Sequence, residues 1–181
     1  MAVLGCGGAG KTTLARRLGS LLGIEVVHID FLRYGPGGHP IPEAKFRALH
    51  REVVNRERWI IDAMKLGLLA DRLEAADTAI FLDRSRLACL TGVLRRRLRY
   101  RGRICPALGV VDWVTWEFLV WIFRFPRDVR PRVLEQIDHH ADTTRVVVLR
   151  NRREIRRFIR DIERRGSLTL SAAMRPSTTR S

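Results

Sequence analysis

The chain has 181 residues, 46% of them hydrophobic, and a formal net charge of +15. This length and apolar content fit one α/β domain with a sizeable core and argue against two independent domains. Arginine supplies all but three of the 34 basic residues, and its planar fork is suited to binding phosphate.

The positive charge is concentrated in two segments. Residues 84–103 hold eight arginines and no acidic residue, and residues 150–165 hold eight arginines with three acidic residues. The rest of the chain is nearly balanced. An anionic partner is therefore implied near these segments, either the phosphates of a nucleotide or a polynucleotide.

The three cysteines predict neither a disulfide framework nor a zinc site, because Cys6, Cys89 and Cys105 lack ligand spacing. This usage fits a reducing cytoplasm, and the opening residues do not resemble a signal peptide. The aromatic-rich run 113–123 is shorter than the about 20 apolar residues of a membrane span. We therefore expect a cytoplasmic protein without a membrane span.

Short apolar runs and amphipathic segments alternate along the first half of the chain. In order, the pattern predicts a short strand at Val3 and Leu4, a glycine loop over 5–13, a helix closed by Gly23, a buried strand over 24–30 ending at Asp30, an irregular loop over 33–42, and a helix from Pro42.

The alternation continues in the second half. It predicts a strand over 59–62, a helix over 66–75, a strand over 78–83, a helix striped by Leu87, Leu90, Leu94 and Leu98, a helix capped by Asp112, a turn between Pro126 and Pro131 into another helix, a strand over 145–149, and a last helix with a capping box at Asn151 and Glu154. Residues 1–165 are thus expected to form one domain with a parallel sheet covered on both faces, and residues 166–181 a disordered tail.

The stretch "GCGGAGKTT" matches the phosphate-loop pattern and lies between a predicted strand and a predicted helix. Glycines let backbone N–H groups turn toward phosphate oxygens, and the helix N-terminus adds its positive end. Lys11 is expected to reach the β and γ phosphates, and the Thr12 hydroxyl to bind Mg²⁺. The predicted nucleotide-binding residues are Gly5, Gly7, Gly8, Ala9, Gly10, Lys11, Thr12 and Thr13.

The remaining motifs favour transfer of a phosphate over its hydrolysis. The chain lacks the Asn-Lys-x-Asp motif of a GTPase, and its strands end in Asp62-Ala63 and Asp83-Arg84 rather than in the Asp-Glu of a motor ATPase. Phosphoryl transfer is stabilised chiefly by cations and positioning, which arginines supply. The sequence therefore favours an ATP-dependent kinase.

Several stretches together resemble a bacterial family, the DNA topology modulation proteins, which are similar to adenylate kinase. The resemblance covers residues 1–160. It rests on "GCGGAGKTTLARRL", "VVHID", "WIID", "RLEAADTAIFLDRSR", "RRRLRYRGR", "DWVTWEFLVWIFRFPRDVRP" and "VVVLRNRREIRRF". The chain departs from the family after the third strand, where Ala63-Met64-Lys65 stands in place of Gly-Asn-Tyr.

The resemblance implies a phosphate-loop NTPase fold, with five parallel strands in the order 2-3-1-4-5 and a helical lid near residues 100–125. It also implies roles for individual residues. Asp62 would help to hold Mg²⁺ through water, and Asp30 would bind or deprotonate the acceptor. Arg96, Arg97 and Arg130 would clamp the transferring phosphate.

Other conspicuous residues are interpreted structurally. His28 alternates into a buried strand and reads as a core histidine, and His139 and His140 read as surface residues. Trp113, Trp116 and Trp121 are expected to pack the lid against the core rather than to stack bases.

Three functions remain open at this stage. The first is an ATP- and Mg²⁺-dependent phosphotransferase acting on a nucleotide, nucleoside or other small acceptor. The second is an ATP-binding, DNA-associated regulator with little kinase turnover, and the third is a nucleotide-sensing scaffold. The sequence does not determine the acceptor or the oligomeric state.

Overall fold

A computed structural model describes residues 1–33, 39–100 and 114–165 of the chain. Its strands are β1 (Ala2–Gly5), β2 (Val26–His28), β3 (Ile60–Asp62), β4 (Thr78–Leu82) and β5 (Arg145–Leu149). Its helices are α1 (Lys11–Leu22), α2 (Ile29–Leu32), α3 (Glu43–Val54), the 3-10 turn η1 (Leu66–Leu68), α4 (Leu69–Glu74), α5 (Arg86–Arg99), α6 (Trp116–Asp128), α7 (Arg130–His139) and α8 (Arg152–Arg165).

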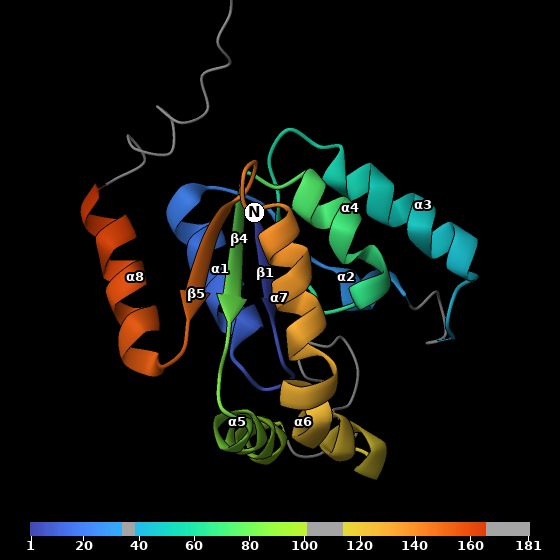
Figure 1. Cartoon of the computed structure of the whole chain (residues 1–181), viewed down its shortest axis with the longest axis vertical. Coiled ribbons are helices and arrows are strands. Elements are labelled where there is room, and N and C mark those ends of the chain that lie inside the picture. Colours follow the sequence, from blue (N-terminus) through green and yellow to red (C-terminus); the bar gives the residue numbers. More distant parts are fainter. Residues whose placement is uncertain (34–38, 101–113, 166–181) are drawn as a thin grey trace, which may run out of the picture.

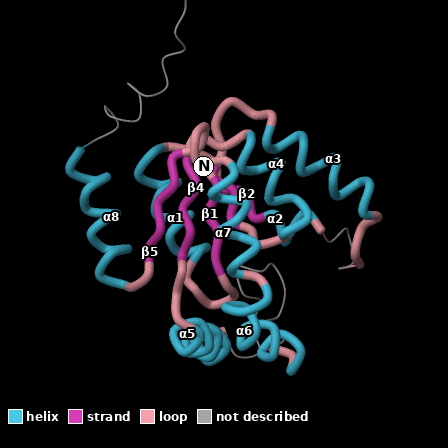
Figure 2. The backbone as a smooth tube through the Cα atoms, in the orientation of Figure 1, coloured by secondary structure: helices cyan, strands magenta, loops and turns pink. Residues whose placement is uncertain are grey.

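The five strands form one parallel sheet in the order β2-β3-β1-β4-β5, which confirms the expected topology. Figure 2 shows the strands side by side with helices around them. α1 packs against α8 on one face, while α7 contacts α4 and α4 contacts α3 on the other (Figure 1). The central strands are buried on both faces, as the continuous apolar runs predict.

Two local predictions about helix ends are confirmed. Gly23 ends α1 in the left-handed conformation, with φ 61°, and its N–H bonds to the carbonyl of Gly19. At the start of α8 the Asn151 side chain accepts hydrogen bonds from the N–H groups of Arg153 and Glu154, both at 3.0 Å. These signals work because each depends only on neighbours within one turn.

Two predictions about where an element ends are wrong, one for a strand and one for a helix. The second strand ends at His28, so Asp30 lies in the short helix α2 rather than at a strand end. Pro126 lies inside α6 instead of starting the turn, which falls near Val129. The predicted cap Asp112 lies outside the described residues, and Thr115 caps α6 by accepting the N–H of Phe118 at 3.3 Å.

Most of the leucine stripe of α5 faces outward, whereas Leu90 packs partly buried against the core. Leu87, Leu94 and Leu98 are 71%, 57% and 62% exposed, whereas Cys89 and Val93 are buried. α5 therefore packs through its small residues, against the phosphate loop described below.

The tryptophans of the aromatic segment differ in whether they pack against the core. Trp121 packs against the core and stacks on Phe118, with ring centroids 5.8 Å apart. Trp116 is 74% exposed, so its expected packing is wrong. Trp113, much of the expected lid (101–113) and the expected tail (166–181) lie outside the described residues.

Candidate active site

The phosphate loop joins the buried strand β1 to the N-terminus of α1. Gly8 and Gly10 have φ of 75° and 102°, values that favour glycine and let the loop curl over the helix end. The Lys11 ammonium folds back along the loop and donates to the carbonyl of Cys6 at 3.1 Å. The sequence pattern has therefore produced the glycine turn between strand and helix that it predicts, and binding of phosphate by this turn stays a prediction.

Asp62, at the end of β3, links two elements of the site. Its Oδ2 accepts a hydrogen bond from the Thr12 hydroxyl at 2.5 Å and lies 3.1 Å from Nδ1 of His28. The strand register places His28 directly beside Asp62, although 34 residues separate them in the chain. Thr12, His28 and Asp62 thus meet at the carboxyl edge of the sheet, where ligands bind in open α/β folds.

The surroundings keep Asp62 ionised. Burial alone would raise the pKa of its carboxyl. The hydrogen bond from His28, the charge of Lys11 and the hydrogen bond from Thr12 together outweigh burial, so the pKa of Asp62 lies below its ordinary value. An ionised carboxylate beside a hydroxyl offers the hard oxygen ligands that Mg²⁺ prefers, with phosphates and water completing its shell.

Among the described residues no group of three or more His, Cys, Asp or Glu side chains could hold a metal ion by itself. Thr12 and Asp62 therefore fit Mg²⁺ that arrives together with nucleotide phosphates, which supply the missing ligands.

α5 and α6 lie against the phosphate loop beyond the carboxyl ends of the strands (Figure 1). A Cβ on Gly8 would lie 2.2 Å from the carbonyl oxygen of Cys89, and one on Gly92 would lie 2.1 Å from that of Gly8. A Cβ on Gly7 would meet the Phe118 ring at 2.5 Å. Backbone of the loop and backbone of α5 are thus in direct contact, and α6 covers the loop with an aromatic ring.

Arg130 forms a two-pronged ion pair with Asp83, which follows β4. Its Nε and NH2 groups donate to the two Asp83 oxygens at 2.7 and 2.8 Å. This hydrogen bonding raises the pKa of Arg130. Arg96 and Arg97 lie in the last turn of α5, Arg96 half-buried and Arg97 exposed. A clamping role for these three arginines remains a prediction.

Two site residues escaped the sequence interpretation. His28 reads as a core histidine but pairs with Asp62, and Met64 accepts the N–H of Gly5 through its sulfur at 3.2 Å. The signal for His28 is that its strand and the strand of Asp62 end at the same edge of the sheet. Asp30 follows two residues later in α2, and only its backbone position is described.

Comparison of the sequence with models of protein families and with curated proteins found no match. Solved structures do match. Shikimate kinase from Acinetobacter baumannii is 20% identical with a TM-score of 0.56, over 96% of this chain and 94% of that one. A gluconokinase from Sinorhizobium meliloti is 16% identical with a TM-score of 0.50, over 96% of each chain.

In the described part of the chain no helix is long and apolar enough to cross a membrane.

At sequence identities of 16–20%, the likeness to these structures shows the fold alone. The likeness extends over 96% of this chain in both comparisons. The chain therefore has the fold of the small phosphate-loop kinases.

Proposed function

We propose that the protein is an ATP-dependent phosphotransferase that moves the γ-phosphate of Mg-ATP to a nucleotide, nucleoside or other small acceptor. The observation that carries this proposal is the contact between Thr12 and Asp62, because it joins the phosphate loop to an ionised carboxylate at the edge of the sheet. The kinase fold supports it, since shikimate kinase and a gluconokinase use the same architecture.

Each residue has a role in this proposal. The loop amides and Lys11 hold the β and γ phosphates, and His28 orients Asp62 through its Nδ1–H. Thr12 and Asp62 would hold Mg²⁺ together with the nucleotide, and the ion would supply positive charge against the charge that develops during transfer. Asp30 receives the proton of the acceptor hydroxyl, whose oxygen bonds to the γ-phosphorus as the bond to the ADP oxygen breaks. Arg96, Arg97 and Arg130 stabilise the transferring group.

The test is an assay of ADP formation and of acceptor phosphorylation with Mg-ATP and a panel of nucleosides, nucleoside monophosphates, shikimate and gluconate. Wild type should phosphorylate at least one acceptor. Lys11→Ala and Asp62→Asn should each lose about 100-fold or more in kcat/KM, the scale of losing one electrostatic contact to a transition state.

The matched control is Lys45→Ala, which removes an exposed lysine of α3 and should leave the rate unchanged. Slow hydrolysis alone, with Lys11→Ala equal to wild type, would contradict the proposal. ATP binding without transfer to any acceptor would instead favour a nucleotide-sensing scaffold.

A second candidate is an ATP-binding, DNA-associated regulator, and one surface favours it. A hollow of about 520 Å³ lies between α1 and α8. Ile159, Glu163 and four arginines line it, and the arginines are Arg17, Arg153, Arg156 and Arg160. Arginines spaced along one face suit successive phosphates of a polynucleotide.

For this candidate, binding to duplex DNA should weaken steeply with salt, with a slope of about −0.9 in log affinity against log salt for each phosphate contacted. The triple variant Arg153→Gln/Arg156→Gln/Arg160→Gln should abolish binding, whereas Lys11→Ala should not affect it. Absence of binding at moderate salt would end this candidate.

A further inference from the structure

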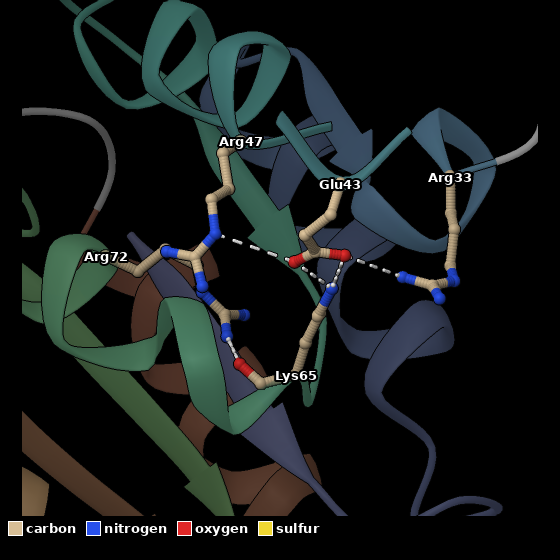
Figure 3. Close-up of polar contacts among 5 residues, drawn as sticks. All are labelled: Arg33, Glu43, Arg47, Lys65 and Arg72. Carbon is tan, nitrogen blue, oxygen red and sulfur yellow. Dashed lines mark hydrogen bonds and ion pairs between the residues drawn. The ribbon is translucent and has the colours of Figure 1, made fainter. Parts of the chain in front are cut away.

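Three cations surround the carboxylate of Glu43 (Figure 3). The Lys65 ammonium donates to both oxygens of Glu43, at 2.7 and 2.9 Å. The Arg33 guanidinium donates to Glu43 at 3.3 Å, and Nε of Arg47 lies 3.6 Å from it. We call Arg33, Glu43, Arg47 and Lys65 the Glu43 cluster.

Two members of the cluster follow closely, along the chain, the paired strand ends of the candidate active site. Arg33 directly follows α2, which follows β2, and Lys65 lies three residues beyond Asp62. β2 and β3 are paired so that His28 lies beside Asp62. The segments that leave these two strands therefore carry Arg33 and Lys65 outward from the edge where a kinase must bring its two substrates together.

Buried groups beneath the cluster hold its cations in place. Arg72 is fully buried and donates to the carbonyls of Ala63, Lys65 and Leu68, at 3.1, 2.6 and 3.0 Å. These three bonds fix the backbone that carries Lys65. The ring of Phe46, 1% exposed, lies 4.4 Å from the Lys65 ammonium and 5.8 Å from the Arg33 guanidinium.

The cluster carries more positive charge than its single acid neutralises. The hydrogen bond from Lys65 is the main cause that lowers the pKa of Glu43, so Glu43 is ionised and the cluster keeps an excess of two positive charges. All four side chains are accessible to a solute, with exposed fractions of 29% for Lys65, 42% for Arg33 and 47% for both Glu43 and Arg47. Excess cations held in fixed positions at a reachable surface are suited to an anion.

We propose that the Glu43 cluster binds an oxyanion group of the phosphate acceptor, a carboxylate or a phosphate, through Arg33, Arg47 and Lys65. This inference rests on the proposed phosphotransferase function and names the substrate class that it requires. The guanidinium forks pair with two oxygens of the group, and Glu43 keeps the three cations gathered until the acceptor arrives.

The test uses inorganic phosphate and acetate as probes, with the phosphate loop already saturated by Mg-ADP. NaCl at the same ionic strength is the reference. In wild type, phosphate or acetate should raise the melting temperature beyond the NaCl reference. Lys65→Gln and Arg47→Gln should each need about five- to tenfold more anion for the same rise, the scale of one partly exposed charged contact.

Three variants guard against indirect effects, and each is compared with its own melting temperature without anion. Arg51→Gln removes an exposed arginine one turn further along α3 and should behave as wild type. Lys65→Arg keeps the charge and should retain binding. Glu43→Gln removes the competing carboxylate, so it should bind the anion several-fold more tightly.

Anion binding should become tighter in Glu43→Gln and weaker in Lys65→Gln. If the cluster only linked two segments of the chain, both variants would lose stability and neither would bind the anion more tightly. The inference is overturned if both anions act no more than NaCl in wild type, or if Lys65→Gln and Arg47→Gln respond as wild type does. If Mg-ADP itself fails to raise the melting temperature, the proposed function falls first and takes this inference with it. The stronger of the two probes identifies the group as carboxylate or phosphate.

Discussion

Two histidines show how the surroundings of a single residue decide its chemistry. His28 ends β2 beside Asp62 and shares a hydrogen bond with that carboxylate. His50, on α3, is fully buried, and neither of its ring nitrogens has a hydrogen-bond partner among the described residues. Burial and the nearby charge of Arg72 lower the pKa of His50 to about 4. His50 is therefore neutral at pH 7 and stabilises the fold only by packing.

His50 predicts a loss of stability in acid. Its pKa is 6.5 ordinarily and about 4 in the folded chain, so the unfolded chain takes up the proton first as the pH falls. The free energy of unfolding should be unaffected above pH 6.5 and should fall by as much as about 3 kcal/mol as the pH drops from 6.5 to 4. Asp71 nearby opposes this shift, and Arg47 adds to it.

His50→Leu should remove most of this acid loss, because a leucine fills the site without a group that protonates. At pH 7 the variant should be as stable as wild type, since it breaks no hydrogen bond of the described residues. Urea unfolding at a series of pH values measures the effect, with the exposed His139→Leu as control. If the free energy of unfolding of His50→Leu fell between pH 6.5 and 4 as much as that of wild type, His50 would not be the cause of the acid loss.

At the scale of elements, α5 shows why an apolar stripe does not by itself identify a buried face. Three of its four leucines point outward because Gly92 touches the phosphate loop through its backbone. Only the side with Cys89, Gly92 and Val93 is narrow enough for that approach. The close contact between the two backbones, rather than burial of the leucines, determines the orientation of this helix.

Gly92→Ala tests this packing. Alanine normally stabilises a helix interior relative to glycine by about 1 kcal/mol. Here its Cβ would lie 2.1 Å from the Gly8 carbonyl oxygen, so α5 or the loop must shift. We expect Gly92→Ala to destabilise the protein by about 1–3 kcal/mol and to weaken binding of Mg-ATP.

The matched control is Gly67→Ala, since a Cβ at Gly67 meets nothing within 4 Å. Chemical unfolding and nucleotide titration of both variants provide the measurement. Equal behaviour of the two variants would show that α5 does not press on the loop.

At the scale of the whole molecule, the net charge of +15 opposes compactness through self-repulsion. Pairs such as Arg56 with Glu25 and Arg17 with Glu163 neutralise only part of it. α5 carries arginines and no acidic residue at all. Repulsion among surface arginines is therefore a property of the fold as a whole rather than of one contact.

Salt should accordingly stabilise the protein. Raising NaCl from about 0.01 M to about 0.15 M shortens the screening length from about 30 Å to about 8 Å, so the melting temperature should rise. Arg95→Gln/Arg99→Gln on α5 should raise the melting temperature at low salt and reduce this response. Arg56→Gln removes a charge that is paired with Glu25 and Glu52, so it should lower the melting temperature at low salt. A melting temperature that falls with salt would show that ion pairs outweigh repulsion.

The sequence by itself determined the order of the strands and of every described helix except α2, the glycine loop, and the helix ends at Gly23 and Asn151. These features depend on residues within a few positions of one another, through backbone conformation and hydrogen bonds inside one turn. Apolar runs flanked by helices also fixed the parallel sheet, because such strands must be covered on both faces.

Only the tertiary structure decided which side chains meet. The contacts from Asp62 to His28 and Thr12 cross 34 and 50 residues of chain, and the one from Lys65 to Glu43 crosses 22. They depend on strand register and on where a helix leaves the sheet, neither of which a local pattern specifies. The loop motif thus predicted that a phosphate is held, while the neighbours of Asp62 and the Glu43 cluster could be found only after the strands had been aligned.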